Sequence, residues 1–266
     1  MLQVQLNPGL PGGRWATLRP LRGYDEALID GAGTGEAIAF LDRMLVATVG
    51  TSVGPGKARE LSISDCDRIF AATYQHYFGD RIESSVPCRK CNEAFELSFS
   101  LSDLMVNLGS GAADQIKGPD EEGIYTLPDG RRFRLPTAGD QDSIIGLEPE
   151  EAAAKLLECC VIEGDPTVNV ERLQRAMDEI GATLELDLEA TCPACDTSQT
   201  VRFNIQSYLL RVLAYEKRFL NHEVHRIALA YGWGYQEILN LTREDRRTFA
   251  RLIEAERAPV RKRMAA

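Results

Sequence analysis

Apolar residues recur at the spacing of an amphipathic helix over much of the chain. Ile38, Leu41 and Met44 fall on one face of a helix that we expect over residues 36–49. Ser64 is the candidate N-cap of a second helix that runs to residue 78. Further helices are expected over residues 149–160, 168–180, 205–218, 221–231, 235–240 and 243–257.

Alternating apolar and polar residues predict strands on both sides of two Cys-x-x-Cys pairs. The pairs are Cys88 with Cys91 and Cys192 with Cys195. Residue types recur around them in one register, so that Ile82 matches Leu186, Leu97 matches Val201 and Phe99 matches Phe203. Each copy therefore predicts a strand, a cysteine turn, a second strand and the start of a helix.

The remaining segments carry turn and loop signals. Residues 1–35 are rich in Gly and Pro and predict an irregular arm, although Leu2–Leu6 alternates like a strand that joins its own sheet. Residues 107–123 predict a loop. Tyr125–Pro136 predicts a hairpin that turns at Pro128-Asp129-Gly130.

These elements predict an α+β fold. Its centre is a small β core built around the two cysteine knuckles, similar to a zinc ribbon, with a helical N-terminal part, a helical insertion and a helical C-terminal tail. We divide the chain into an irregular N-terminal arm (1–35), a helical part (36–80), a zinc-knuckle β core with hairpin and helical insertion (81–204) and a helical C-terminal region (205–266). Because helices separate the two knuckles, we expect one interdependent unit.

Composition and charge narrow the classes of function that the chain could have. Apolar residues make up 44% of the chain and the formal net charge is −10, which is unlike a protein that binds nucleic acid through a basic face. Only the tail Arg257–Arg263 is locally basic. No stretch approaches the roughly 20 apolar residues of a membrane span. Residues 1–6 lack the features of a signal peptide, so we expect folding in a reducing cytoplasm.

The four paired cysteines are the main candidate for chemistry. In a reducing compartment this spacing is typical of metal ligands. Each knuckle supplies two thiolates, so the simplest interpretation is one structural zinc bound by Cys88, Cys91, Cys192 and Cys195. A redox dithiol, an iron–sulfur cluster and knuckles that have lost their metal remain the alternatives.

The other reactive residue types give no catalytic set. Cys66, Cys159 and Cys160 fall among apolar residues of expected helices and are interpreted as packing residues. His222 and His225 stand three residues apart, whereas a metalloprotease helix needs histidines four apart. No phosphate loop or nucleophile elbow is present in the sequence. We therefore expect a protein that is not an enzyme.

Aromatic residues gather near the C-terminus, where Tyr231, Trp233 and Tyr235 surround two glycines. One interpretation is the core of a helical hairpin. The other is an anchor for a partner protein, because Trp and Tyr dominate interface hot spots. His222 and His225, on the preceding helix, are candidates for the same surface.

The run Glu223–Trp233, followed by Glu237-Ile238-Leu239 and Arg246-Arg247, resembles the ending of baseplate proteins of contractile phage tails and related injection systems. In that family a first Cys-x-x-Cys, an Arg-Leu-Pro-Thr segment and a Cys-Pro-x-Cys precede this ending. Here the middle segment is Arg134-Leu135-Pro136-Thr137, and all four elements occur in that order. The resemblance covers residues 80–255.

The resemblance implies a non-enzymatic baseplate subunit in a multi-copy assembly. Its partners would be other baseplate, hub, spike or tube proteins, with no membrane and no nucleic acid. It would be made in a host or bacterial cytoplasm and assembled into a phage tail or an injection particle. The alternative is a zinc-ribbon adaptor for nucleic acid or the transcription machinery, which should place unpaired Lys and Arg around the knuckles.

Overall fold

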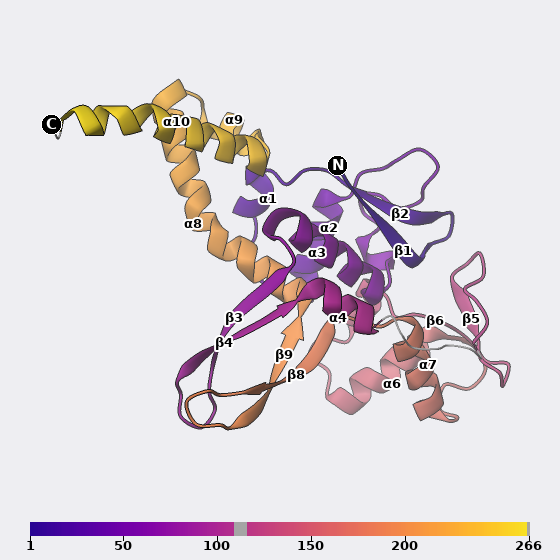
Figure 1. The fold of residues 1–266 in the computed structure, drawn as a ribbon. Coiled ribbons are helices and arrows are strands. Elements are labelled where there is room, and N and C mark those ends of the chain that lie inside the picture. The colour runs from indigo at the N-terminus through magenta and orange to yellow at the C-terminus, as the bar shows by residue number, and fades with distance from the viewer. Residues whose placement is uncertain (109–115, 265–266) are drawn as a thin grey trace.

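The computed structural model describes residues 1–108 and 116–264, and it confirms an α+β fold (Figure 1). The helices are α1 (Gly23–Ala27), α2 (Thr34–Met44), the 3-10 turn η1 (Ala58–Glu60), α3 (Ile63–Phe78), α4 (Leu101–Leu108), α5 (Ala138–Ser143), α6 (Pro149–Cys160), α7 (Val170–Ile180), α8 (Ile205–Tyr231), α9 (Tyr235–Asn240) and α10 (Arg243–Met264). The strands are β1 (Leu2–Leu10), β2 (Gly13–Leu18), β3 (Arg81–Pro87), β4 (Ala94–Ser100), β5 (Ile124–Thr126), β6 (Arg132–Arg134), β7 (Val161–Glu163), β8 (Glu185–Thr191) and β9 (Ser198–Asn204).

The N-terminal segment is ordered, so the predicted irregular arm over residues 1–35 is wrong. Strands β1 and β2 form an antiparallel hairpin, and α1 follows. Two backbone N–H groups at the bend of β1, those of Asn7 and Gly9, donate to the Asp65 carboxylate of α3 at 2.6 and 2.8 Å. The Gly and Pro residues thus shape a bulged hairpin, and only the alternation of Leu2–Leu6 indicated it.

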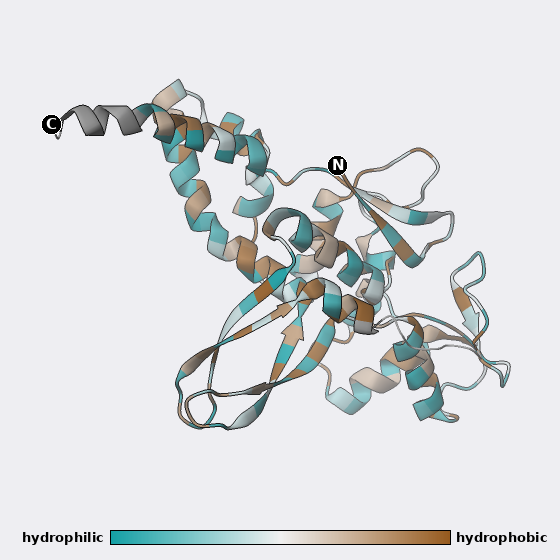
Figure 2. Cartoon of the chain, in the orientation of Figure 1, coloured by the Kyte–Doolittle hydropathy of each residue, from teal (hydrophilic) through white to brown (hydrophobic). Residues whose placement is uncertain are grey.

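The main core lies where α2, α3 and the start of α8 meet the hairpins, and hydrophobic segments concentrate there in Figure 2. Phe40 of α2 and Phe70 of α3 are fully buried and their rings lie 5.7 Å apart. The cap of α3 differs from the prediction: the hydroxyl of Ser62 accepts from the N–H of Asp65 at 3.1 Å, and Ser64 lies in the first turn.

The two cysteine-bearing copies form matching hairpins, as predicted. Strands β3 and β4 pair Ile82 with Phe99, and strands β8 and β9 pair Leu186 with Phe203. The chain enters α4 and α8 at equivalent positions directly after β4 and β9. The Phe99 and Phe203 rings meet edge to face, with centroids 5.1 Å apart, and join the helix-proximal ends of the hairpins.

The segment between the two copies forms a module with its own small core. The predicted hairpin over residues 125–136 is present as β5 and β6, and β7, which the sequence did not indicate, adds a third strand. Phe133 packs there with Leu157 of α6 and Leu173 of α7. Part of the predicted loop over residues 107–123 lies outside the described residues. Figure 1 shows this module and the α9–α10 end on opposite sides of the central helices.

The C-terminal region contains one long helix where the sequence predicted two. Residues 205–231 form α8 without interruption, because no Gly or Pro separates the expected pair and Leu213, Leu220 and Val224 all face the interior. Gly232 then ends α8 at φ 68°, in the left-handed region that favours glycine. The hydroxyl of Thr242 accepts from the N–H of Asp245 at 3.1 Å and so caps the last helix, α10.

Candidate metal centre

The four predicted ligands lie together at the far ends of the two hairpins. Their sulfur atoms all lie within 4.8 Å of one another. The two closest contacts cross between the hairpins: Cys88 Sγ lies 3.6 Å from Cys195 Sγ, and Cys91 Sγ lies 3.7 Å from Cys192 Sγ. The structure therefore brings together residues that are about a hundred positions apart in the sequence, as the matched register predicted.

Each knuckle is built by the same backbone hydrogen bonds. In the first, the N–H of Asn92 donates to the carbonyl of Cys88 at 2.9 Å; in the second, the N–H of Asp196 donates to the carbonyl of Cys192 at 2.9 Å. Asn92 and Asp196 adopt φ of 61° and 53°, which Asn and Asp tolerate better than most residues. This local turn points both sulfur atoms of a pair to one side.

Neighbouring side chains hold the knuckles against each other. Gln199 of β9 accepts from the N–H of Arg89 at 2.8 Å and donates to the carbonyl of Pro87 at 3.2 Å. Cys88, Cys192 and the side chain of Phe95 are buried in a small cluster of their own. One glutamine and a few apolar side chains are thus the protein contacts that join the knuckle ends in the described chain.

The sulfur atoms differ in their electrostatic surroundings. Backbone N–H groups of Cys91 and Lys90 lower the pKa of Cys88 to about 6. The N–H of Glu93 lowers the pKa of Cys91, but desolvation and the sulfur atoms of the other three cysteines raise it to about 12. Several thiolates so close together repel one another, so four charged sulfur atoms need a cation between them.

The arrangement fits a tetrahedral metal ion bound by four thiolates. Zn–S bonds of about 2.3 Å in a tetrahedron place the sulfur atoms about 3.8 Å apart, close to the two distances in the structure. Four protein ligands leave no position for water or substrate, which is the pattern of a structural site. What the structure shows is a four-cysteine cluster able to hold a metal ion.

The ion pairs on the two hairpins lie toward their helix-proximal ends, away from the cysteines. Arg202 Nη2 lies 2.6 Å from Glu185, and Arg81 Nε lies 3.2 Å from Glu83. Arg89 and Lys90 are both exposed in the first knuckle, and neither forms an ion pair with another described residue. The adaptor alternative therefore has two exposed cations at the knuckle end, but the exposed Glu93 and Asp196 lie in the same two knuckles, so this end is not a basic face.

The predicted partner-binding residues are only partly brought together. Tyr231 and Trp233 lie 5.3 Å apart and both contact the ring of Phe249 on α10. Tyr235 is 54% exposed on α9 and takes no part in the aromatic pairs of the described residues. His222 and His225 are exposed on α8, and their role stays a prediction.

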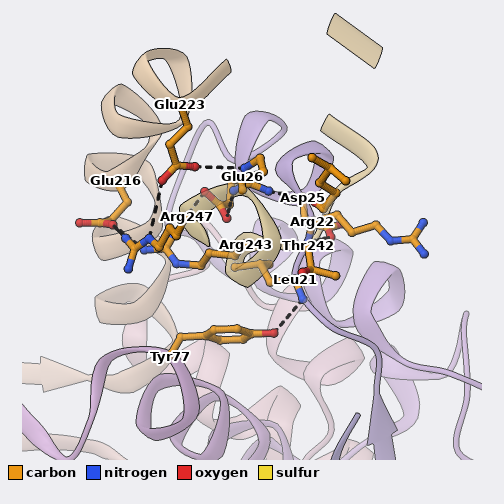
Figure 3. A network of polar contacts seen from close by, with 12 residues as sticks. Leu21, Arg22, Asp25, Glu26, Tyr77, Glu216, Glu223, Thr242, Arg243 and Arg247 are labelled. Carbon is orange, nitrogen blue, oxygen red and sulfur yellow. Dashed lines mark hydrogen bonds and ion pairs between the residues drawn. The ribbon is translucent and has the colours of Figure 1, made fainter. Parts of the chain in front are cut away.

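Sequence reasoning missed a buried network of charges that joins α10 to α8 and α1 (Figure 3). Arg246 is completely buried; its Nη2 lies 2.7 Å from Glu26 and its Nε 3.1 Å from Glu223. Arg243 lies 3.1 Å from Glu26 and 2.5 Å from Glu216. Glu216 and Glu223 lie seven residues apart on one face of α8, and this spacing is the sequence signal that could have indicated the network.

Searches of protein-family models, curated proteins and solved structures found no match to this chain. Among the described residues, no helix is both long enough and apolar enough to cross a membrane.

Proposed function

We propose that this chain is a structural subunit of the baseplate of a contractile phage tail or a related injection system, and that one zinc ion staples its two hairpins together. The zinc staple is supported by the four sulfur atoms, two from each hairpin, that lie within 4.8 Å of one another. A d¹⁰ ion with no redox chemistry suits a purely structural role.

The baseplate assignment is supported by the order of sequence elements, and the positions of those elements fit a structural role. Glu223 and Arg246, from the run that carries the resemblance, contact each other in the buried network. The Arg134–Thr137 segment connects the middle module to α3, since the N–H of Ile63 donates to the carbonyl of Pro136 at 2.9 Å. Both elements hold parts of the chain together, and the partners would be neighbouring baseplate, hub, spike or tube proteins.

Metal analysis tests the staple directly. We expect about one zinc per chain in the purified protein, and loss of zinc from Cys88→Ser and Cys192→Ser. Cys159→Ser is the matched control, because Cys159 lies in α6 and is not one of the four clustered cysteines. Zinc at a hundred times its dissociation constant would stabilise the fold by about 2.7 kcal/mol, so a chelator should lower the melting temperature of the wild type and of Cys159→Ser only.

Particle assembly tests the second half of the proposal. The tagged chain should co-sediment with sheath and tube proteins, and Cys88→Ser should reduce both its folded yield and its incorporation. A Cys88→Ser protein that is free of metal, fully stable and normally incorporated would refute the staple. A wild-type protein that binds zinc but never enters particles would refute the baseplate role alone.

The zinc-ribbon adaptor is the competing function. Its binding to DNA should be strongest at low salt, because phosphate contacts are electrostatic. A mobility-shift assay with the zinc-loaded protein separates the two functions: a specific complex would favour the adaptor, and no complex at low salt would remove it.

A further inference from the structure

Helix α8 exposes a stripe of basic and apolar side chains along its outer face. The members recur three and four residues apart and therefore share one side of the helix. They are Arg211, Tyr215, Arg218, Phe219, His222, Arg226 and Leu229. Tyr215, Phe219 and Leu229 are 58%, 42% and 66% exposed, and their sharing one helix face is what distinguishes them from apolar side chains scattered singly over a surface.

The stripe is basic although the chain carries a net charge of −10. The two acidic residues of α8, Glu216 and Glu223, turn inward to the arginines of α10. Arg226 pairs with Glu254, whereas no carboxylate of the described residues forms an ion pair with Arg211 or Arg218. Two guanidinium groups on this face therefore have no counter-charge among the described residues.

The centre of the stripe is held in place by its own contacts. The guanidinium of Arg218 lies 3.7 Å from the ring centroid of Tyr215 and 4.6 Å from that of Phe219. Such cation–π contacts restrict three side chains that would otherwise be free at the surface. A rigid aromatic and arginine surface loses little entropy on binding, which is the property of an interface anchor.

We propose that this stripe is a docking site for an acidic amphipathic helix of another protein. From Arg211 to Leu229 the stripe covers about 27 Å at 1.5 Å per residue, which matches a helix of about five turns. Acidic side chains of the partner would meet Arg211 and Arg218, and its apolar side chains would cover Tyr215, Phe219 and Leu229. The net negative charge of the chain repels such a partner elsewhere, so the stripe also sets where it binds.

The surface fits a helix better than a nucleic acid. Apolar side chains interleave with the cations at helical spacing, and a phosphate backbone would leave Leu229 uncovered. This inference goes beyond the proposed function, because the docking requires neither the metal ion nor a baseplate.

A peptide titration tests the proposal. The probe is a labelled helical peptide of 21 residues that carries Glu on one face and Leu on the adjacent face. A peptide of the same composition and charge in scrambled order is the control. We expect saturable binding to the full-length protein that weakens with salt. Arg218→Glu and Arg211→Glu should weaken binding at least tenfold, while Arg175→Glu, the same charge change at an exposed site on α7, should not.

Several results would overturn the proposal. They are equal binding of the scrambled peptide, equal weakening by Arg175→Glu, and no binding at low salt. If single-stranded DNA binds the wild type but not Arg218→Glu, while both proteins bind the peptide equally well, the stripe is a nucleic-acid surface instead. A dimer in sedimentation experiments that Arg218→Glu dissociates would identify a second copy of this chain as the occupant. Circular dichroism of each variant establishes that it is folded.

Discussion

Replacement of Arg246 by alanine should strongly destabilise the attachment of α10. The side chain is fully buried and donates to three groups: Glu26 at 2.7 Å, Glu223 at 3.1 Å and the carbonyl of Leu241 at 3.0 Å. Glu26 is itself 1% exposed, so the variant leaves a buried carboxylate with Arg243 as its remaining partner. Breaking a buried ion pair from one side costs about 3–5 kcal/mol.

Urea denaturation followed by circular dichroism and by Trp233 fluorescence measures this loss. With a urea dependence of about 3 kcal/mol per M, the midpoint of the variant should fall by about 1–2 M. Trp233 reports on the affected region because its ring contacts Phe249 of α10. Arg251→Ala, an exposed arginine on the same helix, should change stability by less than about 0.5 kcal/mol.

A double variant separates lost charge pairing from lost packing. Arg246→Met keeps most of the buried volume, and adding Glu26→Gln removes the charge that is left behind. The double variant should therefore be more stable than Arg246→Met alone. If Arg246→Ala costs no more than Arg251→Ala, the network does not hold α10 in place and the reasoning is refuted.

Two further predictions concern single buried positions. Burial raises the pKa of Asp67 to about 6, so its protonated form stabilises the fold below the ordinary pKa near 4, and this contribution is lost as pH rises through 6. Asp67→Asn should therefore remove about 2 kcal/mol from the difference in unfolding free energy between pH 4 and pH 7, and an unchanged difference would contradict the raised pKa. Gly23→Ala should lower the free energy of unfolding by about 1–3 kcal/mol in thermal melts, because a Cβ there would lie 3.0 Å from the Cα of Leu239. Gly31→Ala, where a Cβ would enter open space, should leave stability nearly unchanged.

The sequence predicted best where two signals agreed. The strand, cysteine turn and strand of each copy were predicted, because alternation, turn position and an internal repeat agreed. Helices α3, α6, α7 and α9 were predicted nearly to their ends by apolar spacing and caps. The cysteine cluster followed from the same repeat, since equivalent positions in two packed hairpins meet about a shared axis.

The failures have physical causes. Residues 2–18 form a hairpin, and Asp65, fifty-six positions after Gly9, accepts the backbone N–H groups of its bulge. No local sequence pattern shows this long-range contact. The division of α8 into two helices ignored the fact that Arg218 and Asn221 interrupt apolar spacing without ending a helix. The buried network was missed, because charged residues are usually exposed and the spacing of Glu216 and Glu223 alone does not show that tertiary contacts place Arg246 inside.

Different interactions join the two hairpins at their two ends, and this difference determines where a metal ion would contribute most. At the helix-proximal end, Phe99 and Phe203 are in contact and the Tyr208 hydroxyl donates to the carbonyl of Glu83 at 2.7 Å. At the knuckle end, the described contacts between hairpins are the cysteine sulfur atoms, Gln199 and a small apolar cluster. A bound ion would replace repulsion among four thiolates with four strong bonds at the point where protein packing is weakest. The zinc proposal therefore gives the knuckle end bonds of its own, whereas the helix-proximal end is already held by side-chain contacts.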